Sequence, residues 1–343
     1  MRAAVTENRA TMSVVDVPEP GDPGPGEVIV RPEAVGLCGS DFHYFLGDIG
    51  LETQLYPRIQ GHEAAGVVEQ VGPECPAGLR AGERVAIWPL GSCGRCYPCR
   101  IGRANVCANI SLVGVHRDGA LQERLVLPAA QVFPVGTQDP ALAALIEPVS
   151  IAVQAVARGR IAADEKVVVF GAGPIGQAIA VAAVDRGASV LLLDPLESRL
   201  RRGRSGAETL VAENGGQAVA AAREWAGGDG PEAVFEATGV ADVARAAVEL
   251  VAPAGRVIVV GLASHEAPLR IGDLAFKELD VLGVSCCDAG GFAAAVSLVA
   301  RREDALAGLV THEFPLEQTP AAIEYSMRNP AEVMKTVIRL KSP

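Results

Sequence analysis

Lys166-Val-Val-Val-Phe-Gly-Ala-Gly-Pro-Ile-Gly176 is the stretch of sequence that decides the fold. Its apolar start predicts a buried strand, and the glycines that follow match G-x-G-x-x-G at the opening of a helix. Gly171 permits the tight turn, Gly173 lets the backbone approach a pyrophosphate, and Gly176 lets helix and strand pack closely. The helix N-terminus offers free N–H groups to the phosphates. We therefore expect a dinucleotide to be bound by Gly171, Gly173, Pro174, Ile175 and Gly176.

An acidic residue at the expected offset selects the cofactor. Asp194 ends the second predicted strand, where a carboxylate accepts hydrogen bonds from both ribose hydroxyls and repels a 2′-phosphate. This favours NAD over NADP. A basic run follows at Arg199, Arg201, Arg202 and Arg204. It is interpreted either as a solvated helix face or as a grip on the adenosine end of the cofactor, for which Arg199 is the best placed.

Strand and helix patterns alternate after Pro140. We predict one helix over 141–158, interrupted at Pro148, and a helix over 174–186 that stops at Gly187. Continuous apolar strands separated by helices indicate a parallel sheet covered on both faces. The fold class is therefore α/β, with a doubly wound, six-stranded Rossmann sheet. Its predicted strands are 166–170, 190–194, 208–211, 233–236, 256–260 and 280–284. Before about residue 135, short β segments broken by glycine and proline predict an irregular, mainly β domain.

Composition excludes several classes of partner. The chain has 343 residues, which suggests two domains, and its 49% hydrophobic and 21% charged residues are typical of a soluble globular protein. The net charge of −11 disfavours nucleic acid and anionic lipid. We see neither a secretory signal nor an apolar run long enough to span a membrane, so we expect a cytoplasmic protein.

Four of the eight cysteines crowd into one short segment. Cys93, Cys96, Cys99 and Cys107 have the spacing of a metal site rather than of a disulfide framework. Four thiolates can surround one Zn²⁺ tetrahedrally and leave no position open, so we predict a structural zinc site.

A second set of candidate ligands is scattered. It consists of Cys38, His62, Glu63 and Glu147. Taken singly, each residue also has an ordinary structural interpretation, because a lone cysteine is usually a small packing residue and a lone histidine is usually hydrogen-bonded. Spacing alone does not join them. A mixed set of sulfur, nitrogen and oxygen donors is nevertheless what a catalytic zinc requires.

Together these segments resemble the zinc-containing medium-chain dehydrogenase family over essentially the whole chain. The motifs that carry the resemblance are Gly36-Leu-Cys-Gly-Ser-Asp-Phe-His43, Gly61-His-Glu63, the four-cysteine segment, Glu147-Pro148, the glycine motif and Glu236-Ala-Thr-Gly239. The resemblance implies hydride transfer from an alcohol to NAD⁺, with the alcohol oxygen polarised by zinc. It also implies that Cys38 and His62 bind this zinc, with Glu63 and Glu147 as direct ligands or near neighbours.

The resemblance assigns further roles. Ser40 is expected to bond the substrate hydroxyl and to pass its proton, through the ribose, to His43. Asp41 is expected to orient the zinc-bound histidine, and Lys335 to pair with Glu63. The nicotinamide end is expected at Thr238, Val260, Leu262 and Ser285.

The resemblance also implies the domain organisation. The C-terminus returns to a GroES-like catalytic domain, which gives a zinc-binding catalytic domain of residues 1–150 and 286–343 and an NAD-binding Rossmann domain of 151–285. Members of the family are dimers or tetramers, so we expect a homodimer or homotetramer. Some relatives lose zinc and serve as quinone reductases or lens crystallins, but the retained Cys38, His62 and Glu63 argue against that alternative.

The substrate class remains open between branches of the family. Cys38-Gly-Ser-Asp-Phe-His-Tyr44, Gly47-Asp-Ile-Gly50 and a glutamate at 147 resemble sorbitol (polyol) dehydrogenases, with Tyr44 either facing the substrate or packed as an ordinary aromatic. Gly114-Val-His-Arg-Asp-Gly119 resembles bacterial enzymes that oxidise sugar acids such as galactonate or gulonate. Arg117 there either pairs with a substrate carboxylate or is an exposed loop arginine. Polyol enzymes usually carry an Arg-aromatic pair where this chain has Ser285-Cys-Cys-Asp288, and threonine dehydrogenase shares the zinc motifs.

Overall fold

The computed structural model describes residues 1–48, 56–262 and 266–340, so Ile49 and Gly50 of the Gly47–Gly50 motif lie outside the described residues. The chain divides into two units. The first comprises Met1–Glu147, Cys287–Glu303 and Val310–Pro343, and the second comprises Pro148–Cys286 and Asp304–Leu309. Compared with the predicted boundaries, the first break falls three residues earlier, and a short C-terminal segment joins the second unit.

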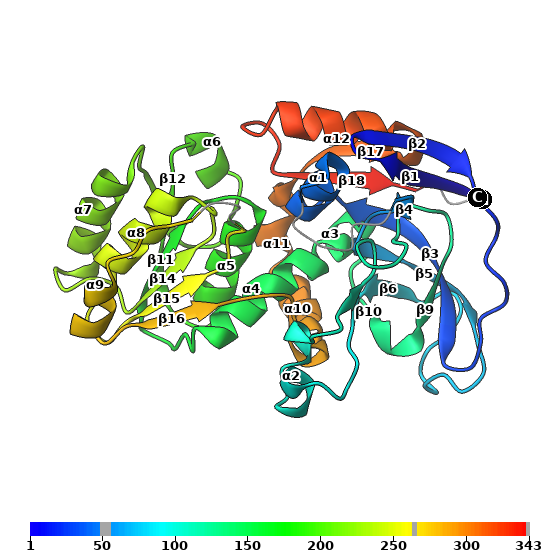
Figure 1. Cartoon of the computed structure of the whole chain (residues 1–343), viewed down its shortest axis with the longest axis horizontal. Coiled ribbons are helices and arrows are strands. Elements are labelled where there is room, and N and C mark those ends of the chain that lie inside the picture. Colours follow the sequence, from blue (N-terminus) through cyan, green and yellow to red (C-terminus); the bar gives the residue numbers. More distant parts are fainter. Residues whose placement is uncertain (49–55, 263–265, 341–343) are drawn as a thin grey trace. The chain divides into compact units, whose positions relative to one another are not determined.

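The second unit is built on a parallel sheet with the strand order β13-β12-β11-β14-β15-β16 (Figure 1). This confirms the predicted six-stranded Rossmann sheet. Val168 is in register with Leu191 of β12 and with Val234 of β14, so β11 lies at the centre of the sheet. The strands are β11 (Lys166–Phe170), β12 (Ser189–Asp194), β13 (Glu208–Val211), β14 (Ala233–Glu236), β15 (Arg256–Val259) and β16 (Asp280–Gly283).

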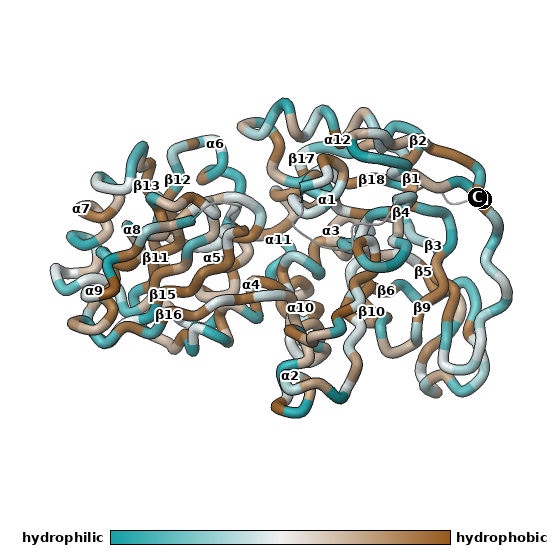
Figure 2. Tube along the Cα trace, in the orientation of Figure 1, coloured by the Kyte–Doolittle hydropathy of each residue, from teal (hydrophilic) through white to brown (hydrophobic). Residues whose placement is uncertain are grey.

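The helices of this unit pack against neighbouring strands of its sheet. α5 (Pro174–Asp185) packs on β11 and β12, whereas α8 (Ala241–Leu250) packs on β14 and β15 and also contacts α7 (Gly215–Ala226). The remaining helices are α4 (Ile146–Arg158), α6 (Glu197–Leu200), α9 (Ile271–Phe276) and α11 (Glu303–Leu306). The central strand β11 is apolar from Val167 to Phe170, as its brown tube shows in Figure 2, and these residues are buried.

The first unit is mainly β, as predicted. Its largest sheet has the order β10-β6-β5-β3-β18-β17, with β9 paired to β3, and a smaller sheet has the order β2-β1-β4. Its buried apolar core includes Val30, Val68 and Ile338. The strands are β1 (Arg2–Asn8), β2 (Thr11–Asp16), β3 (Glu27–Gly36), β4 (Arg58–Ile59), β5 (Glu63–Val71), β6 (Arg84–Ile87), β7 (Leu90–Gly91), β8 (Ser111–Leu112), β9 (Leu125–Pro128), β10 (Val132–Pro134), β17 (Val310–Pro315) and β18 (Lys335–Arg339).

Short helices complete the first unit. They are α1 (Gly39–Leu46), α2 (Tyr97–Arg100), α3 (Pro140–Ala144), α10 (Ala289–Arg301) and α12 (Thr319–Arg328). The predicted helix over 141–158 is interrupted at Leu145 rather than at Pro148. Pro148 is the third residue of α4, and a residue in the first turn needs no backbone donor, so proline is tolerated there.

Among the described residues, one helical run is apolar and long enough to cross a membrane by length and composition alone. It extends over Pro140–Arg158, and 72% of its apolar window is buried inside the structure. Such burial is that of a core helix.

Candidate functional site

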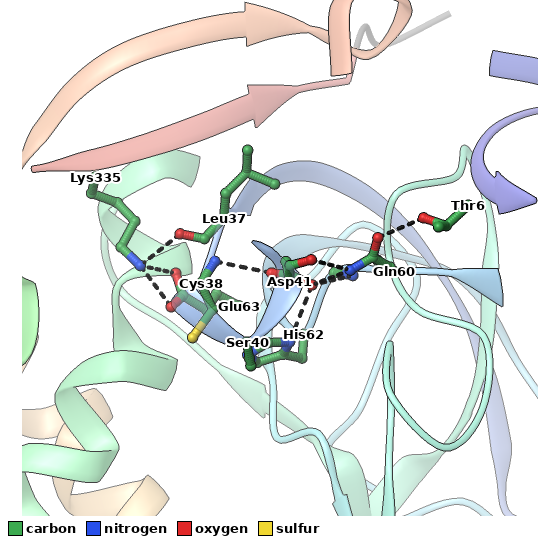
Figure 3. Close-up of polar contacts among 10 residues, drawn as sticks. Thr6, Leu37, Cys38, Ser40, Asp41, Gln60, His62, Glu63 and Lys335 are labelled. Atoms are coloured by element: carbon green, nitrogen blue, oxygen red, sulfur yellow. Dashed lines mark hydrogen bonds and ion pairs between the residues drawn. The ribbon is translucent and has the colours of Figure 1, made fainter. Parts of the chain in front are cut away.

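Three of the predicted metal ligands, and the lysine expected to pair with one of them, lie at the ends of three neighbouring strands of the first unit. Cys38 follows β3, Glu63 opens β5 directly after His62, and Lys335 opens β18. Gly36 is in register with Glu63 and also with Val337, so hydrogen bonding between the strands sets these positions. Residues that are far apart in the sequence therefore meet at the ends of these neighbouring strands (Figure 3).

Cys38 is the N-cap residue of α1. Its backbone N–H donates to Asp41 Oδ2 at 2.9 Å, and its sulfur accepts from the backbone of Asp41 in a capping box. The positive end of the helix dipole stabilises a negative charge at this position. The local fold therefore places the sulfur of Cys38 at the N-terminus of α1, and a metal binds cysteine as the thiolate.

The donor atoms of Cys38, His62 and Glu63 all lie within 4.8 Å of one another. His62 and Glu63 are buried, and Cys38 is partly exposed. One thiol, one imidazole and one carboxylate at these separations fit zinc, which binds such donors at about 2.0–2.3 Å. The structure therefore brings together three of the four residues predicted for this site.

The fourth predicted ligand, Glu147, is absent from this group of converging donor atoms in the part of the chain that the structure describes. Its carboxyl is buried, and burial raises its pKa to about 7, although the charge of His62 acts in the opposite direction. A direct bond from Glu147 to the metal stays a prediction.

Asp41 lies behind His62. Its Oδ1 is 3.7 Å from His62 Nδ1, a nitrogen that has no hydrogen-bond partner among the described residues, and it accepts from Gly61 N at 3.3 Å. Burial raises the pKa of Asp41. Burial lowers the pKa of His62, but the charges of Asp41, Cys38 and Glu147 and a hydrogen bond with Cys38 together outweigh it, so the pKa lies well above its usual value. The geometry agrees with the predicted orienting role of Asp41.

Lys335 forms a buried ion pair with Glu63. Its Nζ donates to both carboxylate oxygens of Glu63 at 2.7 Å and to the carbonyl oxygen of Leu37 at 3.0 Å. Burial lowers the pKa of Lys335, but its ion pair with Glu63 and the charges of Cys38 and Glu147 together outweigh burial, so the pKa is raised and the ammonium stays charged. A Cβ at Gly36 would lie 2.2 Å from Glu63 Oε2, and glycine there therefore makes room for the carboxylate.

The predicted proton relay lies on α1. Ser40 Oγ is 3.4 Å from His62 Nε2, which places the hydroxyl beside the metal ligands. His43 follows one turn later and is exposed, with Nδ1 2.9 Å from Asp48 Oδ1. The backbone N–H of Asp48 also donates to the carbonyl oxygen of His43 after Gly47 ends the helix, so the contact between these side chains is built into the helix terminus.

The four cysteines of the predicted structural site converge in the first unit. Their sulfurs lie within 4.8 Å of one another, with Cys96 Sγ 3.3 Å from Cys99 Sγ and 3.7 Å from Cys107 Sγ. Four sulfurs around one zinc ion are about 3.8 Å apart. Backbone N–H groups of Arg95 and Cys96 lower the pKa of Cys93 to about 6, whereas burial and the neighbouring thiols raise that of Cys99 to about 11. This donor set fits zinc closely.

The glycine motif of the second unit has the geometry of a phosphate cradle. Gly171 is left-handed with φ +95°, and a Cβ at Gly176 would lie 1.7 Å from the carbonyl oxygen of Gly171. A Cβ at Gly173 would meet no atom within 4 Å, so the backbone at the start of α5 is open to a ligand. Pro174 and Ile175 form the first turn of α5, which has no capping side chain. Its N–H groups are therefore available to phosphate oxygens.

Asp194 ends β12 and is buried. Its Oδ2 accepts from the backbone N–H of Ala172 at 2.8 Å, and its Oδ1 accepts from that of Leu196 at 2.8 Å. Arg199 Nη1 lies 3.8 Å from Asp194 Oδ2, so the first arginine of the basic run is directed at this carboxylate. Each carboxylate oxygen can accept a second hydrogen bond. Asp194 therefore both holds the glycine motif and keeps acceptor capacity for a ribose.

The residues predicted for the nicotinamide end follow the carboxyl ends of parallel strands. Thr238 comes after β14, Val260 and Leu262 come after β15, and Ser285 comes after β16. Glu236 Oε1 accepts from the backbone N–H groups of Thr238 and Gly239, which fixes the first of these loops. All four residues lie at the carboxyl ends of the parallel strands, as the glycine motif does, and ligands of such sheets bind at these ends.

Two residues considered for substrate binding have other surroundings. Tyr44 is almost fully buried and makes an edge contact with Tyr56 at 5.6 Å between ring centroids, which supports the packed interpretation. Arg117 is half-buried and donates to Gln131 Oε1. It lines a cavity of about 360 Å³ together with Cys93, so it is not a plain exposed arginine.

Sequence reasoning missed Gln60, Thr6 and Asp48. Gln60 donates to Asp41 and accepts from Thr6, and both side chains are fully buried. Buried polar side chains usually have a hydrogen-bond role, but glutamine and threonine are ordinary surface residues. Only the position of Gln60, two residues before His62, could have drawn attention to it.

Comparisons with known proteins agree with both units. The family model for the "Alcohol dehydrogenase GroES-like domain" matches residues 24–137, and that for the "Zinc-binding dehydrogenase" matches residues 174–301. The chain is 33% identical to L-galactonate-5-dehydrogenase of Escherichia coli K12, over 94% of each chain. It is 30% identical to sorbitol dehydrogenase of Bacillus subtilis 168, over 98% of this chain and 97% of the relative.

A solved structure gives the same result. The short chain alcohol dehydrogenase rspB of E. coli CFT073, crystallised with the cofactor NADH, superposes with a TM-score of 0.88 at 30% identity, over 99% of both chains. With the two converging donor sets, the zinc-binding family match confirms the prediction of one structural and one catalytic zinc site.

Proposed function

Because the chain belongs to the zinc-containing medium-chain alcohol dehydrogenase family, we propose that it oxidises a secondary alcohol of a polyol or sugar acid to the ketone, with NAD⁺ as the oxidant. The observation that carries this proposal is the placement of Ser40 beside the converging donor atoms of Cys38, His62 and Glu63. A hydroxyl that can take up a proton thus lies next to a site for a Lewis acid.

When bound, the zinc ion supplies a Lewis acid to the substrate oxygen, and the nicotinamide accepts a hydride. The residues of the chain handle the proton. Ser40 is placed to accept it from the substrate hydroxyl, and His43, on the same face of α1, is placed to receive it at the next stage. Asp48 accepts from His43 Nδ1–H, which leaves Nε2 as the basic nitrogen.

The second unit supports NAD as the cofactor. Its glycine motif opens α5 with uncapped N–H groups, and Asp194 presents a buried negative charge where NADP would place a phosphate. Arg199, Thr238, Val260, Leu262 and Ser285 are the proposed contacts for the rest of the dinucleotide. We accordingly assign the cofactor to the domain of 151–285 and the zinc chemistry to the domain of 1–150 and 286–343.

Two substrate classes remain candidates within this function. The relatives include both a sorbitol dehydrogenase and an L-galactonate-5-dehydrogenase at similar identity. Arg117 lines a cavity, and a guanidinium there would favour an acidic substrate. The same cavity is lined by Cys93 of the structural zinc site, so Arg117 does not decide between the two classes. We therefore name the class as secondary alcohols of polyols and sugar acids, with threonine as the runner-up.

The sheet edge of the second unit supports a homodimer. β16 has a neighbour on one side in the described part of the sheet, and most of its residues are exposed, unlike those of the central strands. Val281 of β16 is 42% exposed, and Phe276 and Ile271 are 92% and 78% exposed on α9, which precedes β16 in the chain. An open strand edge and large exposed apolar side chains in the same unit fit a second copy of this chain. We propose a dimer or a tetramer built from such dimers, in the cytoplasm.

The proposal is tested by measuring zinc content and NAD⁺ reduction on one preparation. The substrates are polyols, sugar acids, threonine and simple alcohols. Two zinc ions per chain and the fastest turnover with a polyol or a sugar acid support the proposal. Preference for threonine would replace the substrate class, and a zinc-free chain without dehydrogenase activity would support the crystallin-like alternative.

A further inference from the structure

The carboxylate of Asp41 requires hydrogen-bond donors around it, because it presents only acceptor oxygens to its neighbours. Its Oδ2 accepts from Cys38 N and its Oδ1 from Gly61 N, both of which are backbone groups. Besides the ring of His62, a further side-chain donor faces Asp41. Gln60 Nε2 lies 2.8 Å from the Asp41 carbonyl oxygen and 3.4 Å from Asp41 Oδ1 (Figure 3).

This requirement fixes the orientation of the Gln60 amide. Its NH₂ group must face Asp41, so its Oε1 must point the other way. There it is 2.5 Å from Thr6 Oγ1, and the threonine hydroxyl must be the donor. Thr6 is held in place by strand pairing, since it is in register with Arg58 of β4 just before Gln60. Gln60 and Thr6 have no exposed surface, so water cannot replace either partner.

We propose that Gln60, fixed by Thr6, is a positioning residue for the catalytic zinc site: it holds Asp41 opposite His62 Nδ1 and so slows the loss of zinc. The inference rests on the proposed function, because it assumes that Cys38, His62 and Glu63 hold zinc. Gln60 touches none of the three donor atoms. It acts through Asp41, whose Oδ1 faces the far nitrogen of the His62 ring.

The expected effect follows from the order of contacts. Removing a group bonded directly to a metal-bound histidine typically weakens metal binding by about 10- to 100-fold. Gln60 and Thr6 lie one and two hydrogen bonds further away. We expect the zinc at this site to dissociate faster by roughly three- to tenfold in Thr6→Val and Gln60→Met, and by more in Asp41→Asn.

The test follows zinc release from the holoenzyme to the chelator pyridylazoresorcinol. The two zinc ions are released in separate kinetic phases. Replacing the catalytic zinc by Co²⁺ identifies the phase of the catalytic site, because Co²⁺ bound by one sulfur absorbs differently from Co²⁺ bound by four. Thr6→Val keeps the shape of the side chain and removes only the hydroxyl. Thr6→Ser keeps the hydroxyl and should release zinc at the wild-type rate.

Thr319→Val is the matched control. Thr319 is equally buried in the same unit, but its hydroxyl donates to the carbonyl oxygen of Leu316, away from the site. Faster release of the catalytic zinc alone in Thr6→Val, with the structural zinc released at the wild-type rate and a Tm no lower than that of Thr319→Val, supports the proposal. An unchanged rate, or equal acceleration of both zinc ions as in a loosened fold, overturns it. If the Gln60→Met protein does not fold, Thr6→Val carries the test.

These outcomes are separable from those of the proposed function. A wild-type protein that binds a single zinc ion, at the four cysteines, contradicts the proposed function itself. A wild-type protein with two zinc ions and alcohol oxidation, but with unaltered release in Thr6→Val, contradicts only the role of Gln60.

Discussion

Lys335 Nζ lies 2.7 Å from both carboxylate oxygens of Glu63, and the two side chains are 5% and 1% exposed. The pair joins β18, near the C-terminus, to the residue that follows His62. A carboxylate that shares both oxygens with an ammonium is held on the Lys335 side of the cluster. We infer that Lys335 holds the carboxylate of Glu63 in place beside Cys38 and His62.

Removing Lys335 should therefore destabilise the protein strongly. Lys335→Met leaves a buried, unpaired carboxylate, and we expect the free energy of unfolding to fall by about 3–5 kcal/mol. Adding Glu63→Gln should restore much of the loss, because the double variant has no buried charge at this position. Urea denaturation of the three variants measures the coupling. Equal stability of Lys335→Met and the wild type would show that the pair has no structural importance.

The four-cysteine site should be structural. Cys99→Ser opens a closed zinc shell, and we expect the zinc content to fall from two ions to about one per chain and the Tm to decrease. Elemental analysis and thermal unfolding measure the two effects. Cys75→Ser is the matched control, because Cys75 belongs to neither donor group. Full zinc content and an unchanged Tm in Cys99→Ser would refute the assignment.

Asp194 should determine the preference for NAD. Asp194→Ala removes two acceptors and a negative charge, and we expect kcat/KM for NAD⁺ to fall by roughly 10- to 100-fold while that for NADP⁺ falls less or rises. Asp194→Asn tests the contribution of the bonds to Ala172 and Leu196, because it keeps one acceptor of the same shape. A wild-type preference for NADP⁺ would contradict this role and favour the arginine run.

The exposed apolar side chains of α9 should mark the dimer interface. Phe276→Glu places a charge where a second copy would bury the ring, and we expect the protein to become monomeric. Light scattering after size exclusion measures the mass. Tyr97→Glu is the control, because Tyr97 is also exposed but lies on α2 in the other unit. A dimer that persists in Phe276→Glu would exclude this edge.

Local sequence patterns were enough to predict the cofactor-binding motif and the four-cysteine site. The glycine motif and Asp194 lie on consecutive elements of one unit, so their spacing in sequence reports their spacing in the fold. The four cysteines are equally local. The site around Cys38 was recognisable only through family resemblance, because its donors come from separate strand ends and no spacing rule connects them.

The remaining features depend on tertiary contacts. Thr6 and Gln60 are 54 residues apart, and their hydrogen bond follows from the pairing of β1 with β4. The helix break at Leu145 was placed at Pro148 because proline signals a break, whereas it is accommodated in the first turn of α4. The hydrogen bond and the helix break both depend on the neighbours that a residue has in the fold. The type of a residue alone does not specify these neighbours.

The measurement that tests the central claim most directly is zinc content beside turnover in Cys38→Ser. A secondary alcohol is too weak an acid to lose its proton unaided at neutral pH, so the oxygen needs a Lewis acid. We predict that this variant loses one zinc ion per chain and its alcohol oxidation, keeps the zinc of the four cysteines, and still binds NADH. Normal turnover in a Cys38→Ser protein that lacks the catalytic zinc would contradict the account.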